Sequence, residues 1–308
     1  MTSEPQPLLV TDNRALTVPV IARLAHEATI ELNYQDLKNL ESSRRFLAPG
    51  KRIYVSFLPK QTWAQTEEAC RAVRAAGFDP VPHLPVRLLE SARQLSDILR
   101  GLVREARINE LLLIAGDYDQ ACGPFRCVAD VLRSGALTEH GLQCVSLAGH
   151  PEGHPKVALD TIWRAQLEKI ELAERAGIRA RLVTQMFFDA RPFIDWAREL
   201  RSSGVRCPIV AGVTGPARVT TLFKFALRCG VGPSIRALGA RPTSLLNIIG
   251  DHGPHVVMRS LAEARIAQAS DFTGLHFFCF GGYLRTSEWL YQVAESGVTL
   301  NDSGGFDR

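Results

Sequence analysis

Long apolar runs are absent from this chain. No stretch of its 308 residues reaches the roughly 18 apolar residues that a membrane-spanning helix needs. The amino-terminal segment carries acidic residues and prolines where a secretory signal would carry a basic patch and an apolar core. We therefore expect a cytoplasmic protein that does not use a membrane.

Paired cysteines and a strong excess of one charge are also missing. The seven cysteines are an odd number and form no C-x-x-C pair, which argues against a disulfide framework and against a zinc site. Basic residues outnumber acidic ones by only 36 to 32 and form no long block. This balance gives no reason to expect a nucleic-acid partner, and it suits a small anion or a phosphate-bearing cofactor.

The chain does contain a regular alternation of two kinds of segment. Hydrophobic residues make up 46% and charged residues 22%, which excludes a disordered, collagen-like or coiled-coil chain. Short apolar runs, most of them without polar alternation, predict strands that are covered on both faces. Eight are predicted, at residues 28–32, 52–58, 81–86, 110–117, 143–150, 180–187, 208–214 and 274–280. Helical spacing follows at residues 95–106, 159–173, 193–200, 219–227 and 256–269, and Thr62 with Gln65 predicts a capping box before another helix.

This order of elements predicts the fold class. Strand then helix, repeated eight times without a Pro/Gly/Ser-rich linker, predicts an α/β protein with a single (β/α)8 TIM barrel. The length fits, since such barrels hold about 250 residues before extensions. A doubly wound open sheet is the alternative, because alternation alone does not show closure. We expect the barrel at residues 21–296, between an amino-terminal extension at 1–20 and a carboxyl-terminal tail at 297–308.

Polar residues gather where the predicted strands end, which is where a barrel places its active site. They are Glu31, His83, Asp117, His150, His154 and Gln185, with Gly281 and Gly282 after the last strand. A carboxyl buried against apolar walls has a raised pKa and serves as a general acid near neutral pH, which makes Glu31 a candidate acid. Pairing of Glu31 with an arginine is the structural alternative.

The other strand-end residues have structural explanations too. Asp117 suits an ordinary helix N-cap, and His83 suits an ordinary buried histidine. His150 and His154 have the i, i+4 spacing of a helical metal pair, but Pro151 and Pro155 break such a helix, so no metal site is predicted. The two glycines let the backbone approach a ligand or the next helix.

Five strand ends, taken in order, resemble the methylenetetrahydrofolate reductase family. The segments are PHLPV (82–86), LLLIAGD (111–117), AGHPEGHP (148–155), TQMFFD (184–189) and LHFFCF (275–280). The combination of TQ-x-FFD with HPE-x-HP is distinctive, and the likeness covers roughly residues 28–296. The resemblance implies a barrel that holds FAD, takes a hydride from NADH or NADPH and passes it to 5,10-methylenetetrahydrofolate, giving 5-methyltetrahydrofolate.

The resemblance also implies roles for single residues. Glu31 is similar to the family's general acid, and Asp117 to an aspartate near the flavin that holds the pterin. Substrate-binding positions fall on Gln185, Phe225, Gly281 and Gly282. Cofactor-binding positions fall on His83, Asp117, His150, His154, Arg164 and Lys169.

The chain departs from the family pattern at several of these places. AGD (115–117) stands for RGD, VSFLP (55–59) lacks a flavin-binding threonine, and Gly281-Gly282 replace asparagine and arginine. These departures predict a divergent member, which leaves three alternatives open. The same site could oxidise 5-methyltetrahydrofolate with an acceptor other than NAD(P)+, the barrel could bind folate or flavin without catalysis, or it could be a non-flavin enzyme such as an aldolase. The sequence also allows a homo-oligomer.

Overall fold

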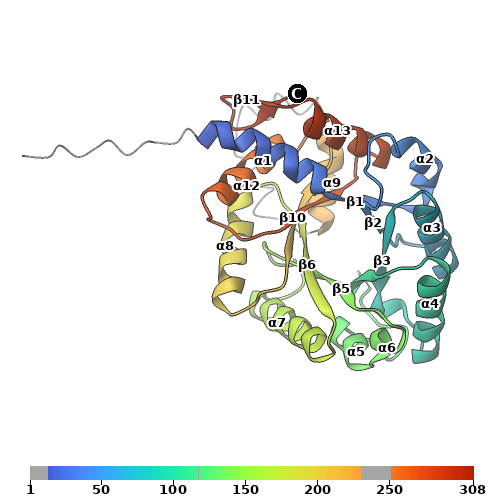
Figure 1. Ribbon diagram of the computed structural model, residues 1–308. Coiled ribbons are helices and arrows are strands. Elements are labelled where there is room, and N and C mark those ends of the chain that lie inside the picture. Colours follow the sequence, from blue (N-terminus) through green and yellow to red (C-terminus); the bar gives the residue numbers. More distant parts are fainter. Residues whose placement is uncertain (1–12, 117, 230–250) are drawn as a thin grey trace, which may run out of the picture.

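The computed structural model describes residues 13–116, 118–229 and 251–308, and the predicted barrel is closed (Figure 1). The strands follow one another around the barrel in the order β1-β10-β7-β6-β5-β4-β3-β2, so β1 pairs in parallel with both β2 and β10. Closure confirms the (β/α)8 fold over the doubly wound alternative. The strands are β1 (Thr29–Leu32), β2 (Arg52–Val55), β3 (Asp79–Pro85), β4 (Glu110–Ile114), β5 (Cys144–Gly149), β6 (Arg179–Met186), β7 (Ile209–Thr214) and β10 (Gly274–Phe278).

Helices follow the strands and surround the barrel (Figure 1). The Thr62–Gln65 capping box is present at the start of α3. The helices after β1 to β4 are η1 (Tyr34–Asn39), α2 (Leu40–Ser43), α3 (Trp63–Ala75), η2 (Val86–Leu88), α4 (Ala92–Glu105), α5 (Val128–Arg133) and α6 (Ala136–Glu139). Those after β5 to β10 are α7 (Leu159–Arg175), α8 (Ala190–Ser202), α9 (Val219–Cys229), α12 (His255–Ile266) and α13 (Tyr283–Glu295).

Ordered structure continues on both sides of the predicted barrel segment. Helix α1 (Asn13–Glu27) packs against α12 and α13, with Thr17 and Ile21 buried, so the boundary predicted at residue 20 falls inside a helix. The tail forms an antiparallel pair, β11 (Thr299–Leu300) with β12 (Phe306–Asp307). Phe306 is 1% exposed and lies against the rings of His255 and Trp289.

Alternation along each strand separates two sets of side chains. Side chains such as Ile30, Ile53 and Leu111 point outward and join the main core beneath the helices. A second, smaller cluster fills the barrel interior, formed by Tyr54, Val81, Leu112, Val183 and Val210. The interior is therefore packed rather than open, and a ligand has room only beyond the strand ends.

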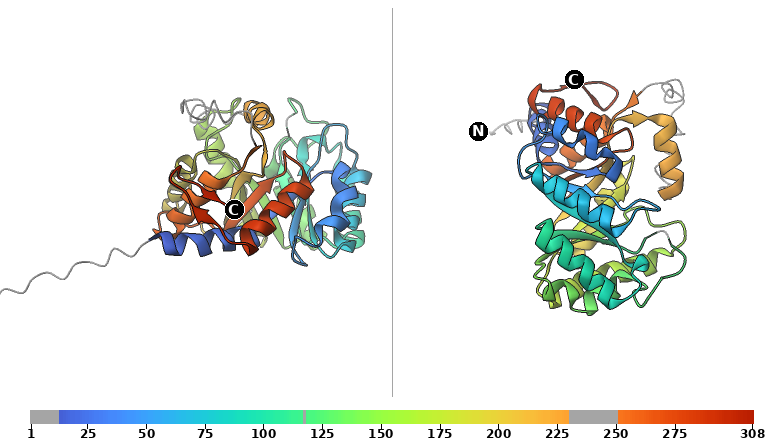
Figure 2. Two further views of the ribbon diagram at one scale, coloured as in Figure 1. Left: turned by 90° about the horizontal axis from the view of Figure 1, so that it is seen from above. Right: turned by 90° about the vertical axis from the view of Figure 1, so that its right-hand side faces the viewer.

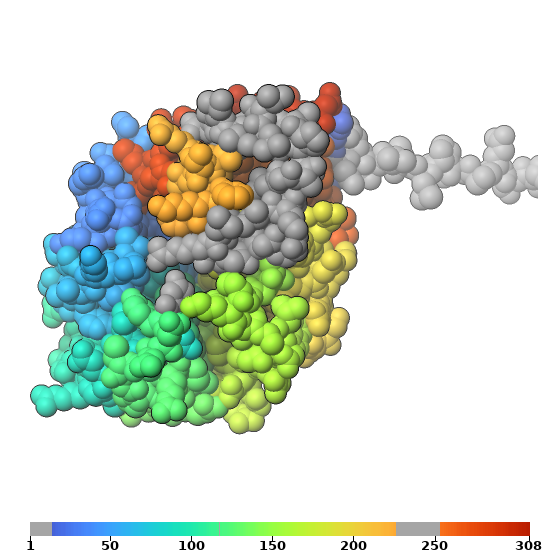
Figure 3. Space-filling view, turned by 180° about the vertical axis from the view of Figure 1, so that it is seen from behind, coloured from blue at the N-terminus to red at the C-terminus, as the bar shows by residue number. Residues whose placement is uncertain are grey.

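Helix α9 marks the carboxyl-terminal end of the barrel. It follows β7 through the short strand β8 (Ala217–Arg218), which pairs with β9 (Asp251–His252). Figure 2 shows α9 (orange) standing away from the barrel wall, and Figure 3 looks onto the end of the barrel where α9 lies. This is the end to which the predicted site residues belong.

Candidate active site

Glu31 lies at the centre of a polar cluster inside the carboxyl-terminal end of the barrel. Its Oε1 atom is 3.4 Å from Nε2 of His83 and 3.5 Å from Nε2 of His276. Its Oε2 atom accepts a hydrogen bond from Ser56 Oγ at 3.1 Å. The carboxylate is 14% exposed and the two imidazoles 11% and 0%, so the three groups are largely shielded from water.

Strand pairing explains why these residues meet. Glu31 is on β1, and its inward-facing position is opposite Tyr54 of β2, while Thr29 is opposite His276 of β10. Closure of the barrel thus brings the first and last strands together. His83 reaches the same point from β3.

The pKa of Glu31 shifts in the direction opposite to the one predicted from the sequence. Burial by itself raises the pKa of this carboxyl, as expected from the sequence, but the polar contact with His276, the charges of His83 and His276, and the hydrogen bond from Ser56 together outweigh it. The pKa of Glu31 is therefore lowered, not raised. The charged partners recorded for Glu31 within the described residues are the two histidines, and its pairing with an arginine stays untested.

Burial acts on His83 in the opposite direction, because it disfavours the charged form of a base and so lowers its pKa. Burial lowers its pKa more than the carboxylate of Glu31 raises it, and the positive charge of His276 lowers it further. Among the described residues, neither Nε2 of His83 nor Nε2 of His276 makes a hydrogen bond of regular geometry. Both nitrogen atoms are held at ion-pair distance from Glu31 and can exchange a proton with it.

His276 is a site residue that the sequence analysis missed. It is fully buried, and its Nδ1 lies 2.9 Å from Thr29 Oγ1. The signal was available, because His276 is the second residue of the LHFFCF segment, and strand alternation puts it on the same face as Phe278.

A second polar group follows β5. Lys169 of α7 is half-buried, and its Nζ donates a hydrogen bond to the carbonyl of Ala148 at 3.0 Å. Burial lowers the pKa of Lys169 to about 8, with a smaller opposing effect from Cys127. His150 lies next to this group, and burial, together with the charges of Lys169 and His154, lowers the pKa of His150 to about 3. His150 is therefore neutral over the whole physiological range.

His154 and Gln166 also belong to this region, and they differ in their polar contacts. The rings of His150 and His154 are 5.9 Å apart, edge to face, and His154 Nδ1 accepts the backbone N–H of Lys156. Gln166, one turn before Lys169 on α7, is 2% exposed, and neither of its amide atoms has a hydrogen-bond partner in the described part of the chain.

Arg164 is placed differently from the other predicted cofactor-binding residues. Its side chain is 75% exposed and forms an ion pair with Asp160, one turn earlier on α7. At 100° per residue, it lies on the opposite side of the helix from Gln166. The structure brings Lys169 and His150 together and leaves Arg164 on the surface.

Aromatic side chains gather at the mouth of the barrel. The rings of Phe225 on α9 and Phe280 after β10 are stacked, with centroids 4.0 Å apart and planes 13° apart. Phe278 stacks on Phe280 at 5.8 Å, and Met186 and Phe188 belong to the same cluster. Gln185 precedes Met186 on β6, where the pairing of β6 with β7 shifts in register between Val183 and Met186.

The two glycines after β10 have a structural role. A Cβ atom on Gly281 would lie 1.9 Å from the carbonyl oxygen of Pro216, so only glycine allows this loop to pass the β7–β8 connection. Gly282 has φ of 112° and is the N-cap residue of α13. Their predicted contact with substrate stays a prediction, and Asp117 lies outside the described residues.

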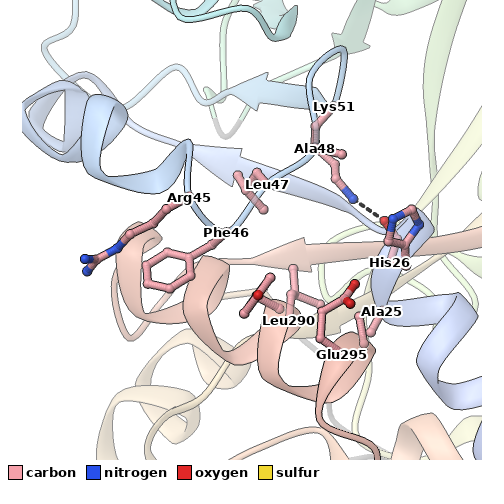
Figure 4. Close-up of a pocket in the computed structure, with 11 residues that line it drawn as sticks. Ala25, His26, Arg45, Phe46, Leu47, Ala48, Lys51, Leu290 and Glu295 are labelled. Carbon is pink, nitrogen blue, oxygen red and sulfur yellow. Dashed lines mark hydrogen bonds between the residues drawn. The ribbon is translucent and has the colours of Figure 1, made fainter.

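A cavity of about 210 Å³ lies at the opposite end of the barrel (Figure 4). Its walls come from the end of α1, from the segment before β2 and from the last turns of α13, all near the amino-terminal ends of the strands. Inside it, Lys51 donates a hydrogen bond to the carbonyl of His26 at the end of α1 (Figure 4). The cavity therefore belongs to the packing of α1 and not to the Glu31 cluster.

Two kinds of feature are absent from the described ranges 13–116, 118–229 and 251–308. No group of three or more histidine, cysteine, aspartate or glutamate side chains is arranged to hold a metal ion there. Within the same ranges, no helix is long and apolar enough to cross a membrane.

Comparison with known proteins connects this geometry to one family. The sequence model of the methylenetetrahydrofolate reductase family matches residues 60–232, more than half of the chain. Methylenetetrahydrofolate reductase (NADH) 1 of Arabidopsis thaliana is 29% identical over 124 residues, which cover 36% of this chain and 21% of that protein. Methylenetetrahydrofolate reductase 1 of Schizosaccharomyces pombe is 31% identical over 98 residues, covering 32% and 15%.

A third relative gives the same result. Methylenetetrahydrofolate reductase 2 of Saccharomyces cerevisiae is 32% identical over 88 residues, covering 29% of this chain and 14% of that protein. The aligned segments thus span about a fifth or less of these relatives. A dihydropyrimidinase structure from Brevibacillus agri, at 9% identity and a TM-score of 0.36 over 58% of this chain and 41% of that one, is too distant to bear on function.

Proposed function

Because the chain belongs to the methylenetetrahydrofolate reductase family, we propose that it is an FAD-dependent oxidoreductase that interconverts 5,10-methylenetetrahydrofolate and 5-methyltetrahydrofolate. The observation that carries the proposal is the Glu31 cluster: a shielded carboxylate between two imidazoles at the end of the barrel where such folds do their chemistry. Hydride transfer to or from a folate carbon requires a proton at a ring nitrogen, and this cluster can hold one.

The residues near β5 fit a flavin cofactor. FAD, when bound, would supply the hydride chemistry. Lys169 offers a cationic group with three donors, of which one is committed to Ala148, and Gln166 offers a buried amide without a partner in the described ranges. His150 and His154 lie beside this group, and His83 contacts Glu31. These residues would hold polar atoms of the cofactor.

Glu31 and the histidines would transfer the proton that the folate nitrogen gains or loses. The lowered pKa of Glu31 keeps the carboxylate charged before folate binds. Entry of the folate removes the remaining water and raises the pKa of the buried carboxyl, so that Glu31 takes up a proton from solvent through the neighbouring imidazoles and passes it to the folate nitrogen. In the oxidative direction the same carboxylate accepts the proton.

One observation favours the oxidative alternative with an acceptor other than NAD(P)+. Phe225 was predicted to bind substrate, yet one of its faces is already covered by Phe280 at 4.0 Å. A nicotinamide ring stacked on that face would have to separate the two phenylalanines. Transfer of the electrons to a different acceptor would avoid this rearrangement.

The visible spectrum of the purified protein tests the proposal. We expect flavin absorbance as isolated, and anaerobic addition of 5-methyltetrahydrofolate should bleach it within one turnover. Rapid bleaching by NADH or NADPH would establish the reductase direction, whereas bleaching by 5-methyltetrahydrofolate alone would establish the oxidative one. A colourless protein that binds no added FAD would overturn the proposal in favour of a non-flavin barrel enzyme, and a flavin that no folate bleaches would leave a binding barrel.

A further inference from the structure

A chain of buried polar groups lies beneath the Glu31 cluster, toward the amino-terminal end of the barrel. It starts at Glu110, the first residue of β4, whose side chain is 8% exposed. The carboxylate is 3.7 Å from Nε of Arg52 and 3.5 Å from Nε of Arg181. Because buried charges are costly unless paired, these two arginines offset the charge of the Glu110 carboxylate.

The chemistry of Glu110 fixes the direction of the hydrogen bonds above it. The hydroxyl of Ser146 donates to Glu110 Oε1, at 2.6 Å, as expected for a carboxylate that faces two arginines. Having used its single proton, the Ser146 oxygen accepts from the hydroxyl of Tyr54, at 2.8 Å. The Tyr54 proton therefore points away from the mouth of the barrel, and it is not available to a substrate.

The ring of Tyr54, by contrast, faces the Glu31 cluster. Its centroid is 4.6 Å from that of His276, with 62° between the planes, and 6.3 Å from that of His83. Edge-to-face contacts of this kind fix the orientation of both rings. The His276 imidazole is thus held on one side by Tyr54 and at Nδ1 by Thr29 Oγ1.

We propose that Tyr54 is a positioning residue, tethered through Ser146 to Glu110, which holds the His276 imidazole with Nε2 facing Glu31. In this arrangement, the Thr29 hydroxyl donates to Nδ1 at 2.9 Å rather than to the more distant Leu275 carbonyl at 3.4 Å, and Nε2, next to the carboxylate, carries a proton. The effect on catalysis rests on the proposed folate chemistry, whereas the effect on the ring does not.

Two variants each remove a hydroxyl group from the hydrogen bonds that connect Tyr54 to Glu110. Tyr54→Phe keeps the ring and removes the hydroxyl, and Ser146→Ala removes the link to Glu110. We expect each to lower the maximal rate of flavin reduction by 5-methyltetrahydrofolate about tenfold, with KM changed by less than about twofold, because binding does not involve the tether. The double variant should be no slower than either single one, since both break the same connection.

Ser43→Ala is the matched control. Ser43 is also fully buried and also bonds a buried tyrosine hydroxyl, that of Tyr283 at 2.9 Å, but between α2 and α13 outside the barrel. We expect this variant to lose thermal stability like Ser146→Ala while keeping the wild-type rate. Equal losses of rate in Ser43→Ala and Ser146→Ala would show a general packing effect and overturn the proposal.

Nitrogen-15 shifts of the histidine rings provide a readout that does not depend on turnover. With the His276 signals assigned through His276→Gln, the wild type should show Nε2 protonated and Nδ1 accepting. Tyr54→Phe and Ser146→Ala should shift both signals toward a mixture of tautomers, and Ser43→Ala should not. Unchanged His276 signals in all variants would overturn the proposal, even if the wild type proved inactive toward folate, a result that would count against the proposed function alone.

Discussion

At the scale of single residues, the state of Glu31 depends on side chains that two other strands bring next to it. Isolation from water would make it a neutral acid, but His83, His276 and Ser56 favour the charged form. A carboxylate and an imidazole that share one proton act as a unit, so removal of the carboxylate should affect chemistry more than binding.

Glu31→Gln tests this role. The amide has nearly the same shape and cannot carry the proton, so we expect folate-dependent flavin reduction to fall at least about a hundredfold. The flavin content of the purified protein should stay that of the wild type. Stopped-flow absorbance at saturating folate measures the rate.

Glu68→Gln is the control for Glu31→Gln. Glu68 is an exposed glutamate on α3 that accepts a hydrogen bond from Tyr34, so its replacement should leave the rate unchanged. If Glu31→Gln turned over folate at the wild-type rate, Glu31 would not be the acid, and another proton donor would have to be sought.

At the scale of elements, the loop after β10 packs closely against the β7–β8 connection at the carboxyl-terminal end of the barrel. Gly281 passes so near Pro216 that the β7–β8 connection and the β10–α13 loop form one layer. The phenylalanines on either side, Phe225 and Phe280, come from these same two connections. Their stacking therefore depends on the spacing of the two loops.

Gly281→Ala should disturb this layer. The added methyl group overlaps the carbonyl of Pro216, and the resulting shift should lower the free energy of unfolding by about 1–3 kcal/mol. Chemical denaturation measures the change. Gly274→Ala, at the start of β10, is the matched control, because no atom lies within 4 Å of the place where its added methyl group would sit, so it should cost little. Equal destabilisation by both substitutions would contradict this account of the loop.

At the scale of the whole molecule, buried titratable groups couple the stability of the barrel to pH. His150 has a pKa of about 3 in the folded protein against 6.5 in the unfolded chain, so the unfolded chain binds the proton first as the pH falls. The lowered pKa of His83 acts in the same direction. The contribution of Glu31, whose pKa is also lowered, is lost only at lower pH, below its unfolded value near 4.5.

We therefore expect stability to fall between pH 6.5 and pH 5. A histidine that stays neutral in the fold contributes up to about 1.4 kcal/mol per pH unit to the free energy of unfolding in this range. Urea unfolding at several pH values should show the loss, and His150→Gln should reduce its slope. Parallel curves for the wild type and His150→Gln would show that His150 is not buried as described.

The sequence by itself determined the elements and the positions of most candidate residues. Apolar runs of strand length, helical spacing and the Thr62 capping box are local patterns, set by neighbours in the chain, and each predicted strand and the capping box are present. The placing of Glu31, His83 and Gln185 at strand ends needed only the rule that barrels use their carboxyl-terminal ends.

Only the tertiary structure decided what surrounds these residues. Closure of β1 against β10 places His276 beside Glu31, and this reverses the direction in which the pKa of Glu31 was expected to move. The same folding pairs Phe225 with Phe280 and leaves Arg164 on the surface, while Lys169 is half-buried and bonded to the β5 backbone. A pKa or a ring contact depends on atoms within a few ångströms, and in a closed barrel those atoms come from strands far apart in the sequence.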